Sequence, residues 1–193
     1  LQHAWSHYQY ISPKSKQITG SVQIDEGRIS GTHAMISSLT DFASAMEKFG
    51  GKTSELLEVI FGGALALRAS DIHLEPTEAK GILRFRIDGL LHPAYEAMDL
   101  QVYHSLVTRI KLLSNLKLNT SREPQDGRFT IDLRGEDVEI RTSVIPSEYG
   151  EAVALRILDP SALQIDLEKL GFREDDLKII REQISRPNGL LLN

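Results

Sequence analysis

Residues 138–158, VEIRTSVIPSEYGEAVALRIL, decide the fold, because apolar and polar side chains alternate on both sides of a short turn. Val138, Ile140 and Val144 are separated by polar residues, and the alternation returns in AVALRIL after the turn. The segment Pro146–Gly150 between them contains the residue types that favour turns. The pattern predicts two strands, each with one buried and one solvated face, which is typical of an antiparallel sheet.

The same period of two occurs upstream, in DIHLE (71–75), LRFRID (83–88) and FTIDL (129–133). The short RGED between FTIDL and VEIRTSV predicts a hairpin. A further short strand is possible by composition at Ser21–Ile24. The centre of the chain is therefore expected to form a meander of strands.

Amphipathic helices are predicted on either side of the first strands. SELLEVIFGGALALRA (54–69) has an apolar stripe with helical spacing, namely Leu56, Leu57, Ile60, Phe61, Ala64 and Leu65. Its two central glycines weaken a helix, which suggests close packing there. VYHSLVTRIKLLSNL (102–116) presents Leu106, Ile110, Leu113 and Leu116 in the same way. In TDFASAMEKFGG (40–51), Thr40 is the expected N-cap and Gly50 the expected end.

This order of elements predicts an α+β sandwich, in which helices cover one face of an antiparallel sheet. Residues 54–160 form that domain in our interpretation, and residues 1–53 read as a loosely patterned connector. A later helix is expected from about Arg173, with its apolar side chains, Leu177, Ile180 and Ile184, facing inward. The unbroken LLL near the end of the sequence favours a buried strand of a parallel sheet.

Composition narrows the classes of function. The formal net charge is -5 and no basic stripe runs along the chain, which argues against a nucleic-acid partner. The sequence has no cysteine, so a disulfide framework, a zinc knuckle and a thiol nucleophile are excluded. No apolar run reaches the roughly 20 residues that span a bilayer, so direct membrane insertion is not expected. We therefore predict a cytoplasmic location.

The motif GGKT, Gly50–Thr53, resembles the end of a phosphate-binding loop. Such a loop needs an earlier glycine, at the position that Met46 occupies, and a preceding buried strand. Met46 instead lies in a predicted helix. We therefore do not expect this motif to bind a nucleotide.

His73, between Asp71 and Glu75 on one face of a predicted strand, suggests a metal site or acid–base chemistry. The alternative is an ion-paired, solvated strand face, which is the more common arrangement and the one we favour. No residue lies in a nucleophile-elbow context, so no catalytic triad is assigned.

The arginines carry more information. Arg128 and Arg141 have the opposite strand parity from the apolar residues, so both should project from the polar face, and the same counting applies to Arg84, Arg86 and Arg156. Clustered guanidinium groups suit an oxyanion such as phosphate, because each can bind two oxygens. The alternative is that they pair with carboxylates inside the fold, the candidates being Asp88, Asp126, Asp132, Glu139 and Glu151. Composition and spacing leave both readings open.

Several motifs, taken in order, resemble the segment before the phosphate-binding loop of the secretion ATPases, which drive type II secretion and type IV pilus assembly. They are ASDIHLEP, RFRIDG, RIK, REPQDGR, VEIRTSVIPSEYGEAVALRIL and LGF followed by RPNGLLLN. The resemblance spans residues 54–193. It implies a PAS-like N2 domain at 54–160. It also implies that residues 161–193 are an interdomain linker with the first helix and strand of a RecA-like ATPase domain, and that residues 1–53 are a linker or a remnant of an upstream domain.

The resemblance also implies a function. Family members form cytoplasmic homo-hexamers peripheral to the inner membrane, where they work with membrane platform proteins, and N2 arginines reach the phosphates of ATP bound by the RecA-like domain. By position these arginines are Arg128 of QDGR and Arg141 of VEIRTS, with Arg122 as a weaker third. ATP and Mg²⁺ would be held by the full-length protein, with the loop lysine and catalytic glutamate downstream of residue 193. We therefore expect this chain alone to hold no cofactor and to be inactive as an ATPase.

Two other functions are compatible with the residues. A PAS-like sandwich can enclose a small molecule, although the predicted core is aliphatic without dispersed polar groups. A docking module for the membrane platform is the other alternative, with residues 1–53 as the natural contact segment.

Overall fold

The structure is a computed structural model that describes residues 21–22, 36–133, 136–158 and 167–190. Contacts within the chain divide it after Leu158 into two compact units. The described part of the first unit carries the sheet and three helices. The described part of the second holds a 3-10 helix, Leu167–Leu170, and α6, Glu174–Ile184. Each unit is described by itself.

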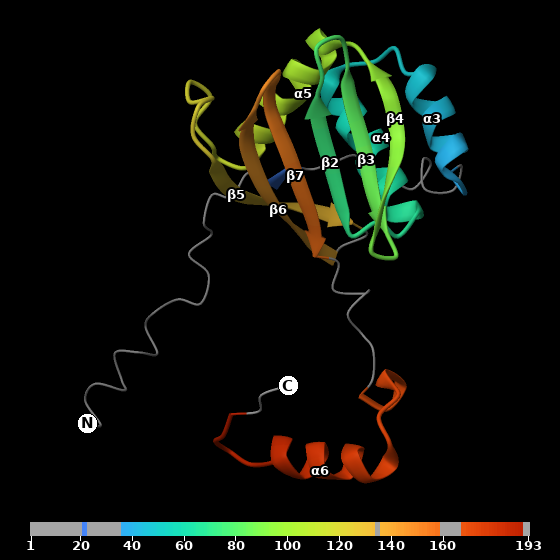
Figure 1. Ribbon diagram of the computed structural model, residues 1–193, viewed down its shortest axis with the longest axis vertical. Helices are drawn as coiled ribbons and strands as arrows, with labels where there is room; N and C mark the ends of the chain where they lie inside the picture. The colour runs from blue at the N-terminus through green and yellow to red at the C-terminus, as the bar shows by residue number, and fades with distance from the viewer. Residues whose placement is uncertain (1–20, 23–35, 134–135, 159–166, 191–193) are drawn as a thin grey trace, which may run out of the picture. The chain divides into compact units, whose positions relative to one another are not determined.

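The first unit is built on a mixed sheet with the strand order β1-β5-β6-β7-β2-β3-β4 (Figure 1). The two-residue β1 pairs in parallel with β5, and the other neighbouring pairs are antiparallel. The strands are β1 Ser21–Val22, β2 Asp71–Pro76, β3 Gly81–Ile87, β4 Leu90–Met98, β5 Gln125–Leu133, β6 Glu136–Ser147 and β7 Gly150–Leu158. All the strands predicted from alternation are present, and β1 matches the described part of the predicted Ser21–Ile24 strand.

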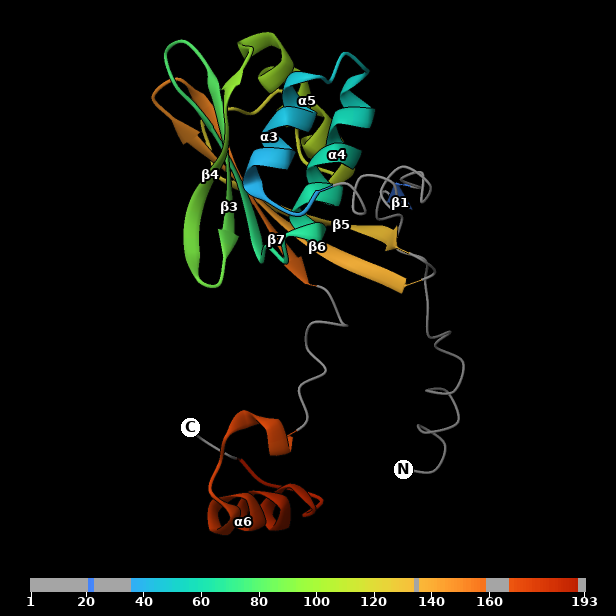
Figure 2. The same cartoon turned by 90° about the vertical axis from the view of Figure 1, so that its right-hand side faces the viewer.

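Three helices lie against one face of this sheet: α3 Leu39–Glu47, α4 Thr53–Ala66 and α5 Leu100–Leu113 (Figure 2). No helix in the described part of this unit covers the opposite face. The predicted combination of an antiparallel sheet with helices on one face is therefore confirmed for the described part of this unit.

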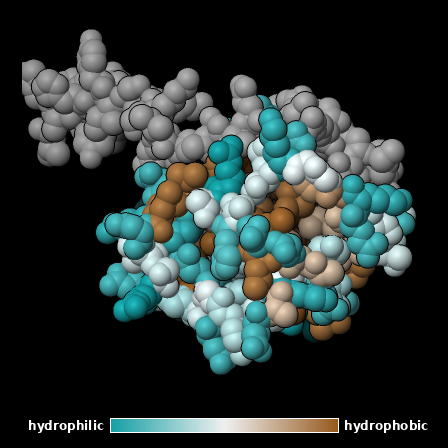
Figure 3. All heavy atoms as spheres, turned by 90° about the horizontal axis from the view of Figure 1, so that it is seen from above, coloured by the Kyte–Doolittle hydropathy of each residue, from teal (hydrophilic) through white to brown (hydrophobic). Residues whose placement is uncertain are grey.

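The core lies between the sheet and these helices. Phe85 of β3, Phe129 of β5, Ile140 of β6 and Leu155 of β7 point inward and are fully buried, as the period of two requires. Seen from the end of the sheet, the described surface is mostly hydrophilic with small hydrophobic patches (Figure 3). Burial of apolar side chains in this layer, at roughly 25 cal/mol per Å², is the main force that holds the helices to the sheet.

Helix α3 takes part in this core. Phe42 is fully buried, and its ring lies 4.8 Å from that of Phe85. A side chain at Gly63 of α4 would collide with the Phe42 ring, so the close packing predicted at the central glycines is confirmed for Gly63. The N-cap of α3 is Ser38, whose hydroxyl accepts from the Asp41 N–H, and not Thr40 as predicted. Thr40 lies inside the first turn, because Ser38 offers the same cap two residues earlier.

Two further expectations need correction. Strand β4 was not predicted, because its sequence LLHPAYEAM lacks regular alternation and contains Pro93, which is tolerated at the sheet edge where β4 lies. Helix α6 is present, but its apolar side chains are not inward: Leu177 and Ile180 are half-buried and Ile184 is 61% exposed. The other described element of its unit is the four-residue 3-10 helix. The strand expected at LLL extends over residues outside the described part.

The C-terminal end of helix α5 lies close to Gly127 of β5. A Cβ at this position would lie 2.6 Å from the backbone oxygen of Ser114, which caps the helix. Beside it, the buried Ser114 hydroxyl donates to the Thr142 hydroxyl at 2.7 Å. The glycine of the QDGR motif therefore lets the end of α5 rest on β5.

Replacing Gly127 by Ala should lower the free energy of unfolding by about 1–3 kcal/mol, because the backbone of α5 must move to admit a methyl group. Urea denaturation measures this loss. Gly50→Ala is the matched control, since a Cβ there meets nothing within 4 Å. Equal stability changes in the two variants would contradict the close contact.

Candidate anion-binding site

The helix-free face of the sheet carries a row of charged residues that crosses five strands. The strand register places Arg128 opposite Arg141, Arg141 opposite Arg156, Arg156 opposite Asp71, and Asp71 opposite Arg86. Neighbouring strands lie about 4.8 Å apart, so the first three side chains form an uninterrupted line of arginines roughly 10 Å long. Residues far apart in the sequence thus meet on one surface.

The three arginines face solvent. The side chains of Arg128, Arg141 and Arg156 are 54%, 67% and 65% exposed. They line an open hollow of about 570 Å³ together with the carboxylates of Asp71, Asp126 and Glu139. The outward direction predicted from strand parity is therefore confirmed for Arg128 and Arg141.

Arg156 was not selected as a site residue from the sequence, although a signal for it existed. Arg141 lies six residues before Ser147 and Arg156 lies six after Gly150, the pair that closes the β6–β7 turn. A tight hairpin at that turn must therefore pair the two arginines. Arg122, the third arginine suggested by the family resemblance, is exposed in the loop before β5 and does not line the hollow.

Asp71 lies in this row between Arg156 and Arg86. Arg156 Nε donates to its Oδ1 at 3.0 Å, Arg86 Nε lies 3.4 Å from its Oδ2, and the Ser70 hydroxyl donates to Oδ2 at 2.8 Å. Burial alone would raise the pKa of Asp71. The hydrogen bonds from Arg156 and Ser70 and the charges of Arg156 and Arg86 outweigh burial and hold that pKa below its usual value. Asp71 is therefore a carboxylate, bridging two arginines.

Glu139, two residues before Arg141 on the same face of β6, plays a similar part for Arg128 and Arg141. Its Oε1 accepts from Arg141 Nε at 3.2 Å and its Oε2 lies 4.0 Å from Arg128 Nη1. The sequence left two interpretations open, an arginine cluster for an oxyanion and arginines paired with carboxylates of the fold. The structure has features of both, because the arginines face solvent and also pair with a carboxylate. Glu151, another acid considered as their partner, pairs instead with Lys111.

His73 lies one row along the sheet, between ion-paired carboxylates. Glu75 pairs with Arg84 at 3.0 Å, and Asp71 is engaged as described. Burial lowers the pKa of His73, against the opposing charge of Asp71, which favours a neutral imidazole. No group of three or more metal-binding side chains comes together in the described part of the chain. The structure shows an ion-paired strand face here.

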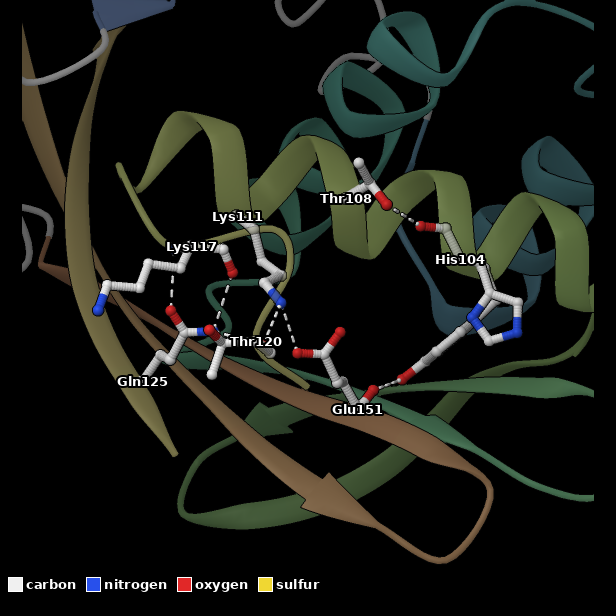
Figure 4. Close-up of polar contacts among 8 residues, drawn as sticks. His104, Thr108, Lys111, Lys117, Thr120, Gln125 and Glu151 are labelled. Carbon is white, nitrogen blue, oxygen red and sulfur yellow. Dashed lines mark hydrogen bonds and ion pairs between the residues drawn. The ribbon is translucent and has the colours of Figure 1, made fainter. Parts of the chain in front are cut away.

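A buried lysine anchors the loop that leads into β5 (Figure 4). Lys111 Nζ donates to Glu151 Oε1 at 2.6 Å and to the Thr120 carbonyl at 2.9 Å. Gln125 Nε2 donates to the Thr120 carbonyl at 2.8 Å, and Gln125 Oε1 accepts from the Lys117 N–H at 2.9 Å. These bonds tie α5, β7 and the start of β5 together, and so fix the strand that carries Arg128.

The GGKT motif lies elsewhere and has a different role. Lys52 is the N-cap of α4 and Thr53 is its first residue. The preceding element is helix α3, not the buried strand that a phosphate-binding loop requires.

Chemically, the hollow suits an oxyanion, because three neighbouring guanidinium groups offer planar pairs of N–H donors. The three lining carboxylates offset the charge of the three arginines. This face alone therefore has no large positive field, and it is suited to contribute donors to an anion that another surface also holds.

The family described as Type II/IV secretion system protein matches residues 48–193. The chain belongs to this family. It is 42% identical over 137 residues to the type II secretion system protein E of Pseudomonas aeruginosa, an alignment that covers 71% of this chain and 27% of the relative. It is 35% identical over 189 residues to the type IV pilus assembly ATPase PilB of Myxococcus xanthus, covering 96% of this chain and 32% of the relative.

The chain thus spans roughly a quarter to a third of the length of these relatives. The X-ray structure of the Legionella pneumophila ATPase DotB shares 14% identity with it, with a TM-score of 0.38, over 65% of this chain and 34% of that one. Among the described residues, none of the helices is long and apolar enough to cross a membrane.

Replacing Lys111 by Met should lower the free energy of unfolding by about 3 kcal/mol, because the Glu151 carboxylate loses its cation in a mostly buried position. The double variant Lys111→Met/Glu151→Gln should recover a substantial part of that loss. Thermal and urea denaturation of both variants test this. Equal losses in the single and double variants would show that the ion pair is not the cause.

Asp71→Asn should lower the free energy of unfolding at neutral pH by about 1–2 kcal/mol, through the loss of charge-assisted hydrogen bonds. Because the pKa of Asp71 is lowered by folding, its stabilisation is complete above its unfolded pKa of about 4 and is lost as the pH falls through the folded value. The difference between wild type and variant should therefore shrink in acid. Denaturation curves as a function of pH measure it, with Asp126→Asn as control. A difference that is constant to the lowest pH at which the protein stays folded would refute the assignment.

Proposed function

We propose that this chain contains the arginine-bearing regulatory domain of a hexameric secretion or pilus-assembly motor ATPase. In this proposal Arg128 and Arg141 contact the phosphates of ATP that a RecA-like domain of the same protein binds. The observation that carries it is the position of the two arginines: adjacent, solvent-exposed and opposite each other on β5 and β6. Membership of the secretion family supports it.

The chemistry explains why such a domain would regulate turnover. In phosphoryl transfer, arginines neutralise charge on the transferred group, while a phosphate-binding loop and Mg²⁺ hold the nucleotide. The described residues supply the arginines, and the rest of the full-length protein would supply the loop, Mg²⁺ and the group that orients water. Closure of this domain on bound ATP would then be required for fast hydrolysis.

Several finer assignments belong to the same proposal. Residues 54–160 would be a PAS-like N2 domain, residues 1–53 a linker or upstream remnant, and residues 161–193 the linker and the start of the RecA-like domain. Arg122 would be a weaker third contact, from its exposed loop. The working protein would be a cytoplasmic homo-hexamer on the inner membrane, in contact with platform proteins.

A small-molecule sensor is less well supported. It would need a cavity between the sheet and the helices, where Phe61 and Phe129 are fully buried and their rings lie 6.0 Å apart. The hollow lined by arginines lies on the outer face instead.

In the full-length protein, Arg128→Ala and Arg141→Ala should each lower kcat for ATP hydrolysis about tenfold or more, because a guanidinium that neutralises transition-state charge is lost. Steady-state ATPase assays on the purified hexamer measure this, with circular dichroism to confirm folding. Arg84→Ala is the matched control: it removes an arginine from the same face, but one that pairs with Glu75 outside the hollow. Parental turnover in the Arg128 and Arg141 variants would refute the proposed role.

A further inference from the structure

Glu139 bridges the two arginines in a particular way. Each of its oxygens faces a different guanidinium, Oε1 toward Arg141 at 3.2 Å and Oε2 toward Arg128 at 4.0 Å. Its side chain is 38% exposed and lines the same hollow. It therefore lies within the space that an incoming ligand of both arginines must enter.

A phosphate would use the same contacts. It presents several acceptor oxygens and a charge of roughly −2 near neutral pH, against the single charge of a carboxylate. Two of those oxygens on two guanidinium groups would reproduce the arrangement that Glu139 now provides, with a stronger attraction. The carboxylate and the oxyanion are thus alternative ligands of one pair of arginines.

Asp71, the carboxylate within the row, differs from Glu139. The Asp71 side chain is 12% exposed and accepts from both Arg156 and Ser70. Separating a mostly buried carboxylate from its hydrogen-bond donors is costly, even where the arginines themselves are exposed, whereas ion pairs whose two partners are both exposed contribute little and break readily. Of these two carboxylates, Glu139 is the one that an anion can displace, while Asp71 remains in place.

We propose that Glu139 is a displaceable internal stand-in for phosphate, which occupies Arg128 and Arg141 until a polyvalent oxyanion replaces it. This rests on the proposed function and adds the regulation of its site. While Glu139 pairs with the two arginines, it lowers their affinity for monovalent anions and carboxylates. Anions with several negative charges, such as phosphate chains, would still displace it. Glu139 also keeps two like charges on adjacent strands compatible while no ligand is bound.

The experiment measures binding of inorganic tripolyphosphate to the 193-residue chain by isothermal titration calorimetry at low ionic strength. Glu139→Gln should bind about two- to fivefold more tightly than wild type, the gain expected from removing one or two exposed ion pairs that compete with the ligand. Asp126→Asn is the matched control. It removes the same charge from the same hollow, but Asp126 does not bridge the two arginines. Its gain should be clearly smaller.

The outcomes separate this inference from the proposed function. Equal gains in Glu139→Gln and Asp126→Asn, or no binding by Glu139→Gln at millimolar ligand, overturn the inference. If the two gains are equal but Arg141→Ala abolishes binding, the arginine site stands and only the role of Glu139 fails. If Arg128→Ala and Arg141→Ala bind as tightly as wild type, the arginine site itself is refuted. Melting temperatures close to wild type are required of each variant, and the isosteric Glu139→Gln change should meet that condition.

Discussion

The antiparallel register of β5, β6 and β7 is the constraint on which the candidate site depends. Because side chains alternate strictly along each strand, a register shifted by one residue would turn Arg128, Arg141 and Arg156 into the core and bring Phe129 and Ile140 to the surface. Burial of those apolar neighbours therefore fixes the position of the arginines. The strand pairing that buries the apolar side chains on one face therefore also determines the positions of the charged side chains on the other face.

The two faces of the sheet are linked residue by residue. Gly127, immediately before Arg128, is where α5 rests on β5, and Thr142, immediately after Arg141, receives the hydrogen bond from the Ser114 hydroxyl. The end of α5 thus contacts the sheet directly behind two of the three arginines. Lys111 then fastens the same helix to Glu151 on β7. A displacement of α5 would therefore act directly on β5, β6 and β7, the strands that carry the three arginines.

Much of the fold could be predicted because the buried face imposes a period of two on each central strand. The alternation pattern does not predict the edge strand β4, because a strand with one free edge tolerates Pro93 and needs no strict alternation. The N-cap was misplaced at Thr40 because two candidate caps lie close together, and side-chain geometry selects Ser38. The apolar stripe of α6 predicts a buried face that the structure does not show. Amphipathicity indicates that a face can be buried, but not which element covers it.

For the site, strand parity was enough to place Arg128 and Arg141 on the polar face, but it could not show which neighbours share a row. That needs the register, which brings in Arg156 and the buried Asp71 from strands distant in the sequence. The family resemblance selected Arg122, whereas the sheet places Arg156 beside the pair.

The charge balance of the hollow has its own consequence. Adjacent arginines repel, and the carboxylates of Asp71 and Glu139, which pair with them, reduce that repulsion. The same carboxylates reduce the attraction that this face exerts on a free anion. Arginines that are already paired with carboxylates therefore bind a free anion only weakly. Tight binding requires a second surface that holds most of the anion's charge. In the proposed function, weak binding by this face alone would have an advantage: the arginines would act only on a nucleotide that another domain already holds, and they would not bind phosphate compounds from solution.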